Sequence, residues 1–336
     1  MATSPIFKQG EGQIEHPLSL VFVPGSWHQP TCYDKVIKII AQKHGVECTA
    51  FTLPSTVGDP AATFKNDIDA ARAAILRATN KGHDVIVIAH SYGGMVGNSA
   101  IKDLTIKDAP NSLTPSTGHV VGLILIASGF TLTGLAFMDP FFGHPPPSWR
   151  VNSSTGFAEL VAPPSKLFYH DLSAEEAAHW VSELRPQALK ALFEGGEHAY
   201  AGWQDVPTWY VGTSEDKAMP VFAQRVQIGM ARVIGGVVEH REMPTSHSPF
   251  LSRPEDVVEI IMDVVDARKR GHVRSGSIVG QSAVRIQRTS EVVTPSVKLW
   301  QPYSWFKFGV PYALGRGIGF GILAWAWGRR MYRSWR

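Results

Sequence analysis

The sequence contains few cysteines, no long repeat and no leading apolar segment. Only two of the 336 residues are cysteines, Cys32 and Cys48. Two thiols in a chain of this length do not form the disulfide framework of small secreted proteins, and we expect both to be reduced. Residues 1–17 hold no apolar stretch of signal-peptide length. We therefore expect the protein to be made and kept inside the cell, in the cytoplasm.

Charge is also scarce, and it is unevenly placed. Charged residues make up 18% of the chain and hydrophobic residues 44%, a composition that allows a globular core and excludes wholesale disorder. From Lys298 to the end there are seven Lys or Arg residues and no acid, although the net charge of the whole chain is only +3. The rest of the chain is therefore net acidic, and we expect it to have no nucleic-acid surface.

Short apolar runs alternate with stretches of helical spacing over most of the chain. The runs are typical of parallel strands that are buried on both faces. The pattern predicts an α/β fold with a mainly parallel sheet and helices on both faces. The expected strands are Val21–Val23, Val46–Leu53, Asp84–Ala89, Val120–Ala127, Val206–Val211 and Val237–Met243, and the expected helices are Tyr33–His44, Ala61–Thr79 and one that begins near Ser91.

The alternation breaks between residues 131 and 204. This segment holds three successive prolines and two helical runs, Ser173–Leu184 and Pro186–Phe193, with the proline starting the second run. It is too long for a simple crossover, so we predict a cap inserted over the sheet. The whole chain then divides into a domain over residues 1–270, a polar linker over 271–295, and an apolar, aromatic and basic tail over 296–336.

The sequence AHSYGG at 89–94 follows the apolar run DVIVIA and precedes a helical stretch. A nucleophile elbow has the pattern small-x-Ser-x-Gly between a strand and a helix. The turn is so tight that the residues two places before and after the serine must be small. Ala89 stands where glycine is commoner, which is a mild departure. We therefore predict that Ser91 is a catalytic nucleophile.

A serine hydroxyl needs a neighbouring base, and in proteins with this elbow the order along the chain is Ser, acid, His. The chain has 13 histidines. His247 follows the last predicted strand, in a loop that can reach Ser91. His240 lies within that strand, and His198 precedes the strand before it. We predict His247 as the base.

The loop after the penultimate strand offers two acids to orient the imidazole, Glu215 and Asp216. Their position does not decide between them. An oxyanion needs backbone N–H donors. One is expected from Tyr92, the residue after the nucleophile, and the other from Ser26 in the loop after the first strand.

Four stretches together resemble the α/β-hydrolase superfamily, in the branch that holds methyl esterases and hydroxynitrile lyases. They are VPGSWH at 23–28, AHSYGG at 89–94, DxxMPxxxQ at 216–224 and HSPFLSRP at 247–254. The resemblance implies the α/β-hydrolase fold, Asp216 as the acid, and a mostly apolar pocket under the cap. The usual His-Gly of the oxyanion loop is Pro24-Gly25 here, which leaves the backbone donor in place. The tail has no counterpart in this branch.

The tail contains a run from Phe308 to Gly328 with one charge, Arg316. Tryptophans stand at its margins and four arginines come after Gly328. Glycines at 315, 317, 319 and 321 permit close helix packing. Three interpretations remain open: a membrane-contacting segment, a tail folded back on the body, and a partner-binding peptide. Arg316 favours a segment lying in the membrane interface over one that spans.

The leading hypothesis is hydrolysis of a small or medium apolar carboxylic ester or thioester through an acyl-Ser91 intermediate. The partner is then a small-molecule ester, and we expect no cofactor and no metal ion. Acyl transfer with the same triad is one alternative. A lyase or a ligand-binding protein on the same fold is another, although a pure binder has no need of Ser91, Asp216 and His247 together.

Overall fold

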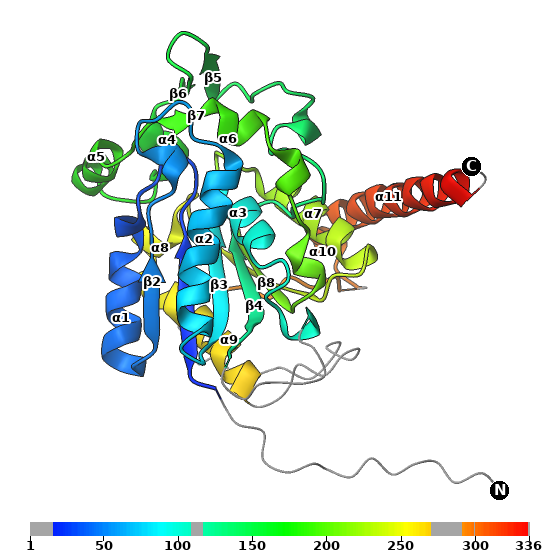
Figure 1. Cartoon of the computed structure of the whole chain (residues 1–336), viewed down its shortest axis with the longest axis horizontal. Helices are drawn as coiled ribbons and strands as arrows, with labels where there is room; N and C mark the ends of the chain where they lie inside the picture. The colour runs from blue at the N-terminus through cyan, green and yellow to red at the C-terminus, as the bar shows by residue number, and fades with distance from the viewer. Residues whose placement is uncertain (1–15, 109–116, 270–290, 299, 335–336) are drawn as a thin grey trace, which may run out of the picture.

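A six-stranded parallel sheet forms the centre of the molecule (Figure 1). The computed structural model describes residues 16–108, 117–269, 291–298 and 300–334. The strand order is β2-β1-β3-β4-β8-β9, and every neighbouring pair is parallel. The prediction of an α/β fold with a mainly parallel sheet is therefore confirmed. The strands are β1 (Leu18–Val23), β2 (Glu47–Ala50), β3 (Asp84–His90), β4 (Val120–Ile126), β8 (Thr208–Thr213) and β9 (Val238–Met243).

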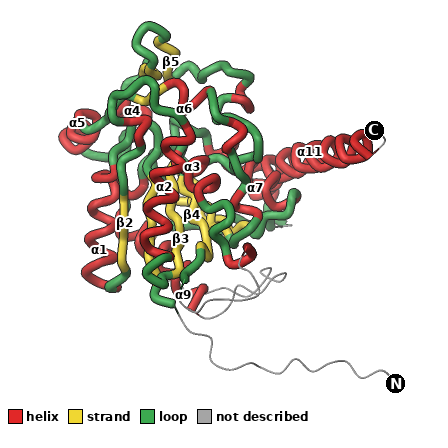
Figure 2. Tube along the Cα trace, in the orientation of Figure 1, coloured by secondary structure: helices red, strands yellow, loops and turns green. Residues whose placement is uncertain are grey.

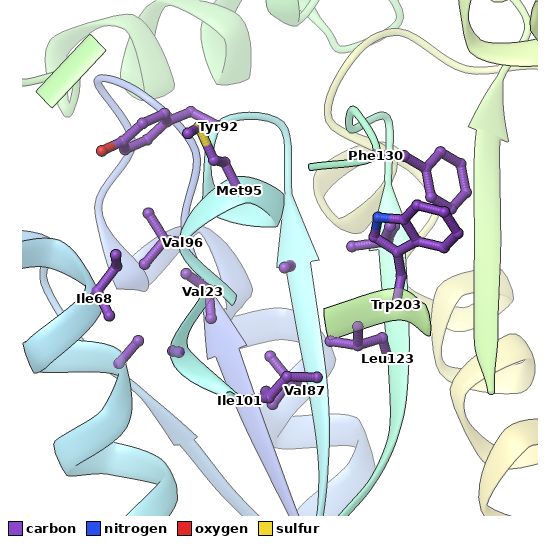
Figure 3. Packing of buried hydrophobic residues seen from close by; sticks show 14 of the residues in the cluster. Val23, Ile68, Val87, Tyr92, Met95, Val96, Ile101, Leu123, Phe130 and Trp203 are labelled. Carbon is purple, nitrogen blue, oxygen red and sulfur yellow. The ribbon is translucent and has the colours of Figure 1, made fainter. Parts of the chain in front are cut away.

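Both faces of the sheet are covered by helices (Figure 2). Alternate residues of a strand point to opposite faces. In β1, Leu20 and Phe22 join the apolar cluster that includes helix α1, whereas Val21 and Val23 join the cluster on the other face. Figure 3 shows part of this second cluster, in which Val87 of β3 and Val96 of α3 are buried. The helices are α1 (Asp34–His44) and α9 (Pro254–Lys269) on one face, and α2 (Phe64–Thr79), α3 (Gly93–Ala100) and α7 (Val221–Val233) on the other.

Local chemistry explains where several elements begin and end. Helix α2 starts at Phe64, three residues later than predicted, because Thr63 caps it: the Thr63 side chain accepts a hydrogen bond from the Asn66 backbone N–H, and the Asn66 side chain accepts one from the Thr63 N–H. Helix α1 ends where predicted, at Gly45, which is left-handed with φ 64°. Strand β8 begins at Thr208, after Pro207, which has no N–H to donate.

The segment between β4 and β8 carries its own three-stranded sheet, in which all the pairings are antiparallel. It lies beyond the carboxyl ends of the large sheet (Figure 1). The predicted start of its second helix at Pro186 is wrong, because Gln187 and Ala188 pair with β6 and the helix begins at Leu189. Its elements are β5 (Trp149–Asn152), β6 (Phe157–Leu160), α4 (Pro164–Phe168), α5 (Ala174–Ser182), β7 (Gln187–Ala188) and α6 (Leu189–Phe193).

The tail begins with two short turns, α10 (Pro302–Ser304) and the π-helical η7 (Trp305–Gly309), and continues as one long helix, α11 (Val310–Ser334). Alternate glycines of α11 have different surroundings. A Cβ on Gly315 would lie 1.9 Å from the backbone oxygen of Val226 in α7, whereas one on Gly317 would meet nothing within 4 Å. The glycine spacing therefore does permit close helix packing, and the partner is α7 of the same chain.

Further contacts hold the start of the tail to the body. Val293 and Glu242 of β9 exchange two backbone hydrogen bonds of 2.8 Å. The Tyr312 hydroxyl lies 2.7 Å from Nδ1 of His240, also in β9. Residues 271–290 of the predicted linker lie outside the described residues. Among the residues described, no helix has the length and apolar character that a membrane span requires.

Candidate active site

The turn between β3 and α3 presents Ser91 at the carboxyl end of the sheet. Ser91 has a φ of 52°, in the left-handed region that serine rarely adopts. Its backbone N–H donates to the carbonyl of Ile126 at 3.1 Å. Its carbonyl accepts a bond of 2.7 Å from the Ser128 hydroxyl. The end of β4 therefore holds the strained backbone in place, and strain of this kind is frequent at functional sites.

The small residues around Ser91 are required by close packing. A Cβ on Gly93 would lie 2.2 Å from the carbonyl oxygen of Pro24, so no larger residue fits there without a backbone shift. Ala89 faces helix α3, and a Cβ on Gly97 would lie 3.2 Å from the Ala89 Cβ. The turn thus has the geometry that the AHSYGG pattern predicts.

His247 and Asp216 are brought together from the loops that follow β9 and β8. Nδ1 of His247 lies 2.7 Å from Oδ2 of Asp216, and both side chains are buried. With a proton on Nδ1, the imidazole donates to the carboxylate and leaves Nε2 unprotonated, as a base requires. Glu215, the other acid considered, is exposed.

Every lone pair of the Asp216 carboxylate faces a donor. Oδ1 accepts from the backbone N–H groups of Ala218 and Met219, both at 2.8 Å. Oδ2 accepts from the Thr213 hydroxyl at 2.7 Å as well as from His247. Burial alone would raise the pKa of Asp216, but the His247 charge and these hydrogen bonds hold it below its usual value. The carboxylate is therefore ionised at neutral pH.

Gln224, the last residue of the DxxMPxxxQ motif, orders the loop that carries Asp216 although the sequence predicted no role for it. Its Nε2 donates to the Met219 carbonyl at 2.7 Å and lies 3.3 Å from Oδ2 of Asp216. Its Oε1 accepts from the Thr213 N–H at 3.1 Å. The fully buried amide thus connects α7 to the end of β8. The signal for this role in the sequence was the spacing: Gln224 follows Asp216 by eight residues and lies one turn into a helix.

His90 links Ser91 to the His247 loop. Its Nε2 lies 2.9 Å from the His247 carbonyl oxygen, and the two imidazole rings are 4.6 Å apart. Burial, followed by the neighbouring His247 and His28 charges, lowers the pKa of His90 well below its usual value. A neutral His90 can donate from Nε2 to this carbonyl. The residue before the candidate nucleophile therefore positions the backbone of the candidate base.

The loop after β1 passes directly beside Ser91. A Cβ on Gly25 would lie 3.0 Å from the Ser91 Cβ, so the backbone of this loop can approach a group bound to the Ser91 oxygen. Ser26, the next residue, is buried. Tyr92 stands at the N-cap of α3, where backbone N–H groups have no partner within the helix. The loop that carries Ser26 and the first turn of α3 thus both lie beside the candidate nucleophile, and the oxyanion role of Ser26 and Tyr92 stays a prediction.

His28, which had no predicted role, fastens this loop to the cap. Nδ1 of His28 lies 2.8 Å from the Ser26 carbonyl, and Nε2 lies 2.9 Å from the hydroxyl of Tyr169 in the cap segment. Burial lowers the pKa of His28 to about 4, so the ring is neutral at neutral pH. With the proton on Nδ1, His28 donates to Ser26 and accepts from Tyr169. The cap and the predicted oxyanion loop are therefore connected through one side chain.

The surroundings of His247 on the cap side are aromatic. The ring of Phe168, at the end of α4, lies 5.6 Å from that of His247 and 6.1 Å from that of Trp27. Trp27 also lies 6.1 Å from Trp149 of β5. The cap holds the His247 loop as well, because the Ser246 hydroxyl donates to the Phe168 carbonyl at 2.7 Å. A group bound beside His247 would meet mainly apolar surface.

Two curated fungal proteins are similar to this chain over most of their length. Alpha/beta hydrolase nvfD of Aspergillus novofumigatus is 28% identical over 250 residues, which cover 72% of this chain and 94% of that protein. Probable hydrolase R7 of a Phoma species is 25% identical over 256 residues, covering 73% and 97%.

Three solved structures share the fold, each with a TM-score of 0.57 and 75% of this chain covered. Polyneuridine aldehyde esterase is 18% identical and covered over all of its chain. A pyrethroid hydrolase from Sphingobium faniae is 19% identical, and tomato methylketone synthase I is 13% identical, each covered to 99%. The profile of the alpha/beta hydrolase family matches residues 20–260, well over half of the sequence. The chain therefore belongs to the alpha/beta hydrolase family.

Proposed function

We propose that this protein is a serine esterase that hydrolyses a small or medium apolar carboxylic ester or thioester. One observation carries the proposal: His247 and Asp216, on the loops after β9 and β8, form a buried pair joined at 2.7 Å, and the His247 backbone is connected through His90 to the strained turn of Ser91. A buried imidazole with an ionised orienting acid, linked to the turn of a partly exposed serine, supplies the base and the nucleophile that nucleophilic catalysis uses.

In the proposed reaction, the Ser91 oxygen attacks the ester carbonyl carbon and its proton passes to Nε2 of His247. Asp216 stabilises the resulting imidazolium through the Nδ1 hydrogen bond. The backbone N–H groups of Ser26 and Tyr92 stabilise the oxyanion. When the tetrahedral intermediate collapses, the bond to the leaving alcohol or thiol breaks and His247 returns the proton to it. Water, deprotonated by His247, then attacks the acyl carbon; the bond between that carbon and the Ser91 oxygen breaks, and His247 returns the proton to the Ser91 oxygen.

The aromatic surroundings of His247 support an apolar acyl or alcohol group in the substrate. Phe168 and Trp27 offer no charged partner for an ionic substrate. The solved relatives whose names state an activity include an esterase and a pyrethroid hydrolase, which supports an ester as the substrate class.

Trapping the intermediate tests the proposal. The protein is mixed with a slowly deacylating p-nitrophenyl ester, quenched in acid and analysed by intact-mass and peptide mass spectrometry. We expect the mass of one acyl group on the peptide that contains Ser91, and its loss with time in water. Faster loss in the presence of a small alcohol, with formation of a new ester, would assign acyl transfer instead. With an ester whose acylation is faster than its deacylation, turnover without any acyl adduct would contradict the mechanism.

A further inference from the structure

Helix α11 and the turns before it expose an unusual amount of apolar surface. Phe306 is 74% exposed and Trp327 is 66% exposed, although soluble monomers rarely expose large apolar patches. We define the apolar tail surface as the exposed large side chains of this segment. They are Trp300, Tyr303, Trp305, Phe306, Val310, Leu314, Ile318, Phe320, Leu323, Trp325, Trp327 and Met331.

One side of α11 is already occupied by the body of the protein. Gly315 and Gly319 approach the backbone of α7, and both are buried. Ile322 packs against the apolar cluster on this face of the sheet. At 3.6 residues per turn, these three positions share one side of the helix. The second half of the helix then projects away from the body (Figure 1).

Most of the remaining circumference of α11 is apolar as far as Gly328, with Arg316 as the one charged residue in this stretch. Leu314 and Ile318 lie one turn apart on one flank, and Phe320 and Trp327 lie two turns apart on the other. All four are at least half exposed. An isolated interfacial helix keeps a polar side toward water. Here the body covers one side of the first half of the helix, and the apolar side chains on the two remaining flanks can contact an apolar medium.

The charges of the segment have one sign. From Lys298 to the end the chain contains seven basic residues and no acidic residue. A second copy would therefore bring like charges together, with no acid in the segment to pair them. Arg316 falls between the side packed on α7 and the Phe320 flank, where its long side chain can reach a polar boundary. Tryptophan and tyrosine are likewise enriched at the boundary between lipid and water.

We propose that the apolar tail surface binds the surface of an anionic lipid bilayer, with α11 lying in the headgroup region and the hydrolase body on the aqueous side. The aromatic side chains supply apolar burial, and the basic side chains supply attraction to acidic headgroups. This inference does not depend on the proposed esterase reaction, because none of these side chains belongs to the candidate active site.

Co-sedimentation of the full chain with vesicles tests the proposal. We expect it to pellet with vesicles of phosphatidylcholine mixed with phosphatidylserine, to pellet less with phosphatidylcholine alone, and to be released by high salt. The double variant Phe320→Ser, Trp327→Ser should bind at least about tenfold more weakly, because each ring loses its apolar burial. A truncation would be a poorer test, since removing α11 also uncovers α7.

Matched variants separate the tail from the rest of the surface. Phe141→Ser, Phe142→Ser removes two exposed aromatic rings from the cap and should leave binding unchanged. Arg316→Gln should weaken binding about fivefold, as expected for one basic residue near an anionic surface, whereas Lys43→Gln on α1 should not. Failure of the full chain to bind anionic vesicles would overturn the proposal. So would equal losses in the tail and cap variants, or light scattering that shows a dimer abolished by the tail variant without any vesicle binding.

Discussion

Replacing Asp216 by asparagine would change the protonation of His247 without changing the size of the side chain. The backbone N–H groups of Ala218 and Met219 bind Oδ1, so they would hold the amide oxygen at that position. The amide NH₂ would then occupy the place of Oδ2 and face Nδ1 of His247. A donor there requires Nδ1 to accept, so the ring proton moves to Nε2.

An imidazole that carries its proton on Nε2 cannot accept the Ser91 proton. In serine triads this exchange lowers kcat by about 10⁴, which is about 5 kcal/mol of transition-state stabilisation. The effect should appear in kcat for a p-nitrophenyl ester, with a small change in KM. Because the substitution is isosteric, the variant should remain folded, and a thermal unfolding curve checks this.

Glu215→Gln is the matched control, because Glu215 precedes Asp216 in the chain but is exposed. We expect its kcat to stay within about threefold of the wild-type value, since the Glu215 side chain is exposed and the hydrogen bond between Asp216 and His247 is kept. The reasoning would be refuted if the Asp216→Asn variant kept near-normal kcat, or if Glu215→Gln proved the more damaging of the two changes.

Two further predictions concern stability, measured by thermal unfolding. Burial lowers the pKa of His28 from 6.5 to about 4. Between pH 6.5 and pH 4 the unfolded chain therefore binds a proton that the folded chain excludes. The free energy of unfolding should fall by about 3 kcal/mol as the pH drops through this range. His28→Asn should remove this part of the pH dependence, whereas His44→Asn at the exposed end of α1 should keep it; identical pH profiles for wild type and His28→Asn would contradict the assignment. Gly315→Ala should lower the unfolding temperature because its Cβ would lie 1.9 Å from the Val226 oxygen, while Gly317→Ala, with open space around it, should raise stability by about 0.5–1 kcal/mol. Equal shifts in the two glycine variants would show that α11 does not dock on α7.

The sheet and the elbow could be predicted because their signals are local. The DVIVIA run before Ser91 is apolar at every position after Asp84, and β3 is indeed buried throughout. The small strands of the cap could not be predicted in the same way. Strand β7 has two residues, Gln187 and Ala188, which carry no periodicity and are defined only by pairing with β6.

The network around the candidate site depends on contacts between distant segments. The sequence predicted that His247 follows the last strand and that an acid follows the strand before it. The positions of Glu215 and Asp216 in that loop did not show which of the two is the acid, and only the family resemblance favoured Asp216. The links through His28 and Tyr169 join residues 141 positions apart and have no local pattern. The glycines of the tail did indicate close helix packing, but nothing local identified α7 as the partner.

Labelling with a fluorophosphonate probe tests the central claim most directly. The probe phosphonylates a serine only when a neighbouring base activates it. Full-length protein is incubated with the probe, digested and mapped by tandem mass spectrometry, beside the folded Ser91→Ala variant. We predict one modified residue, Ser91, with labelling lost in Ser91→Ala and strongly slowed in Asp216→Asn. Labelling of another serine, or labelling that persists in Ser91→Ala, would contradict the assignment of Ser91 as the nucleophile.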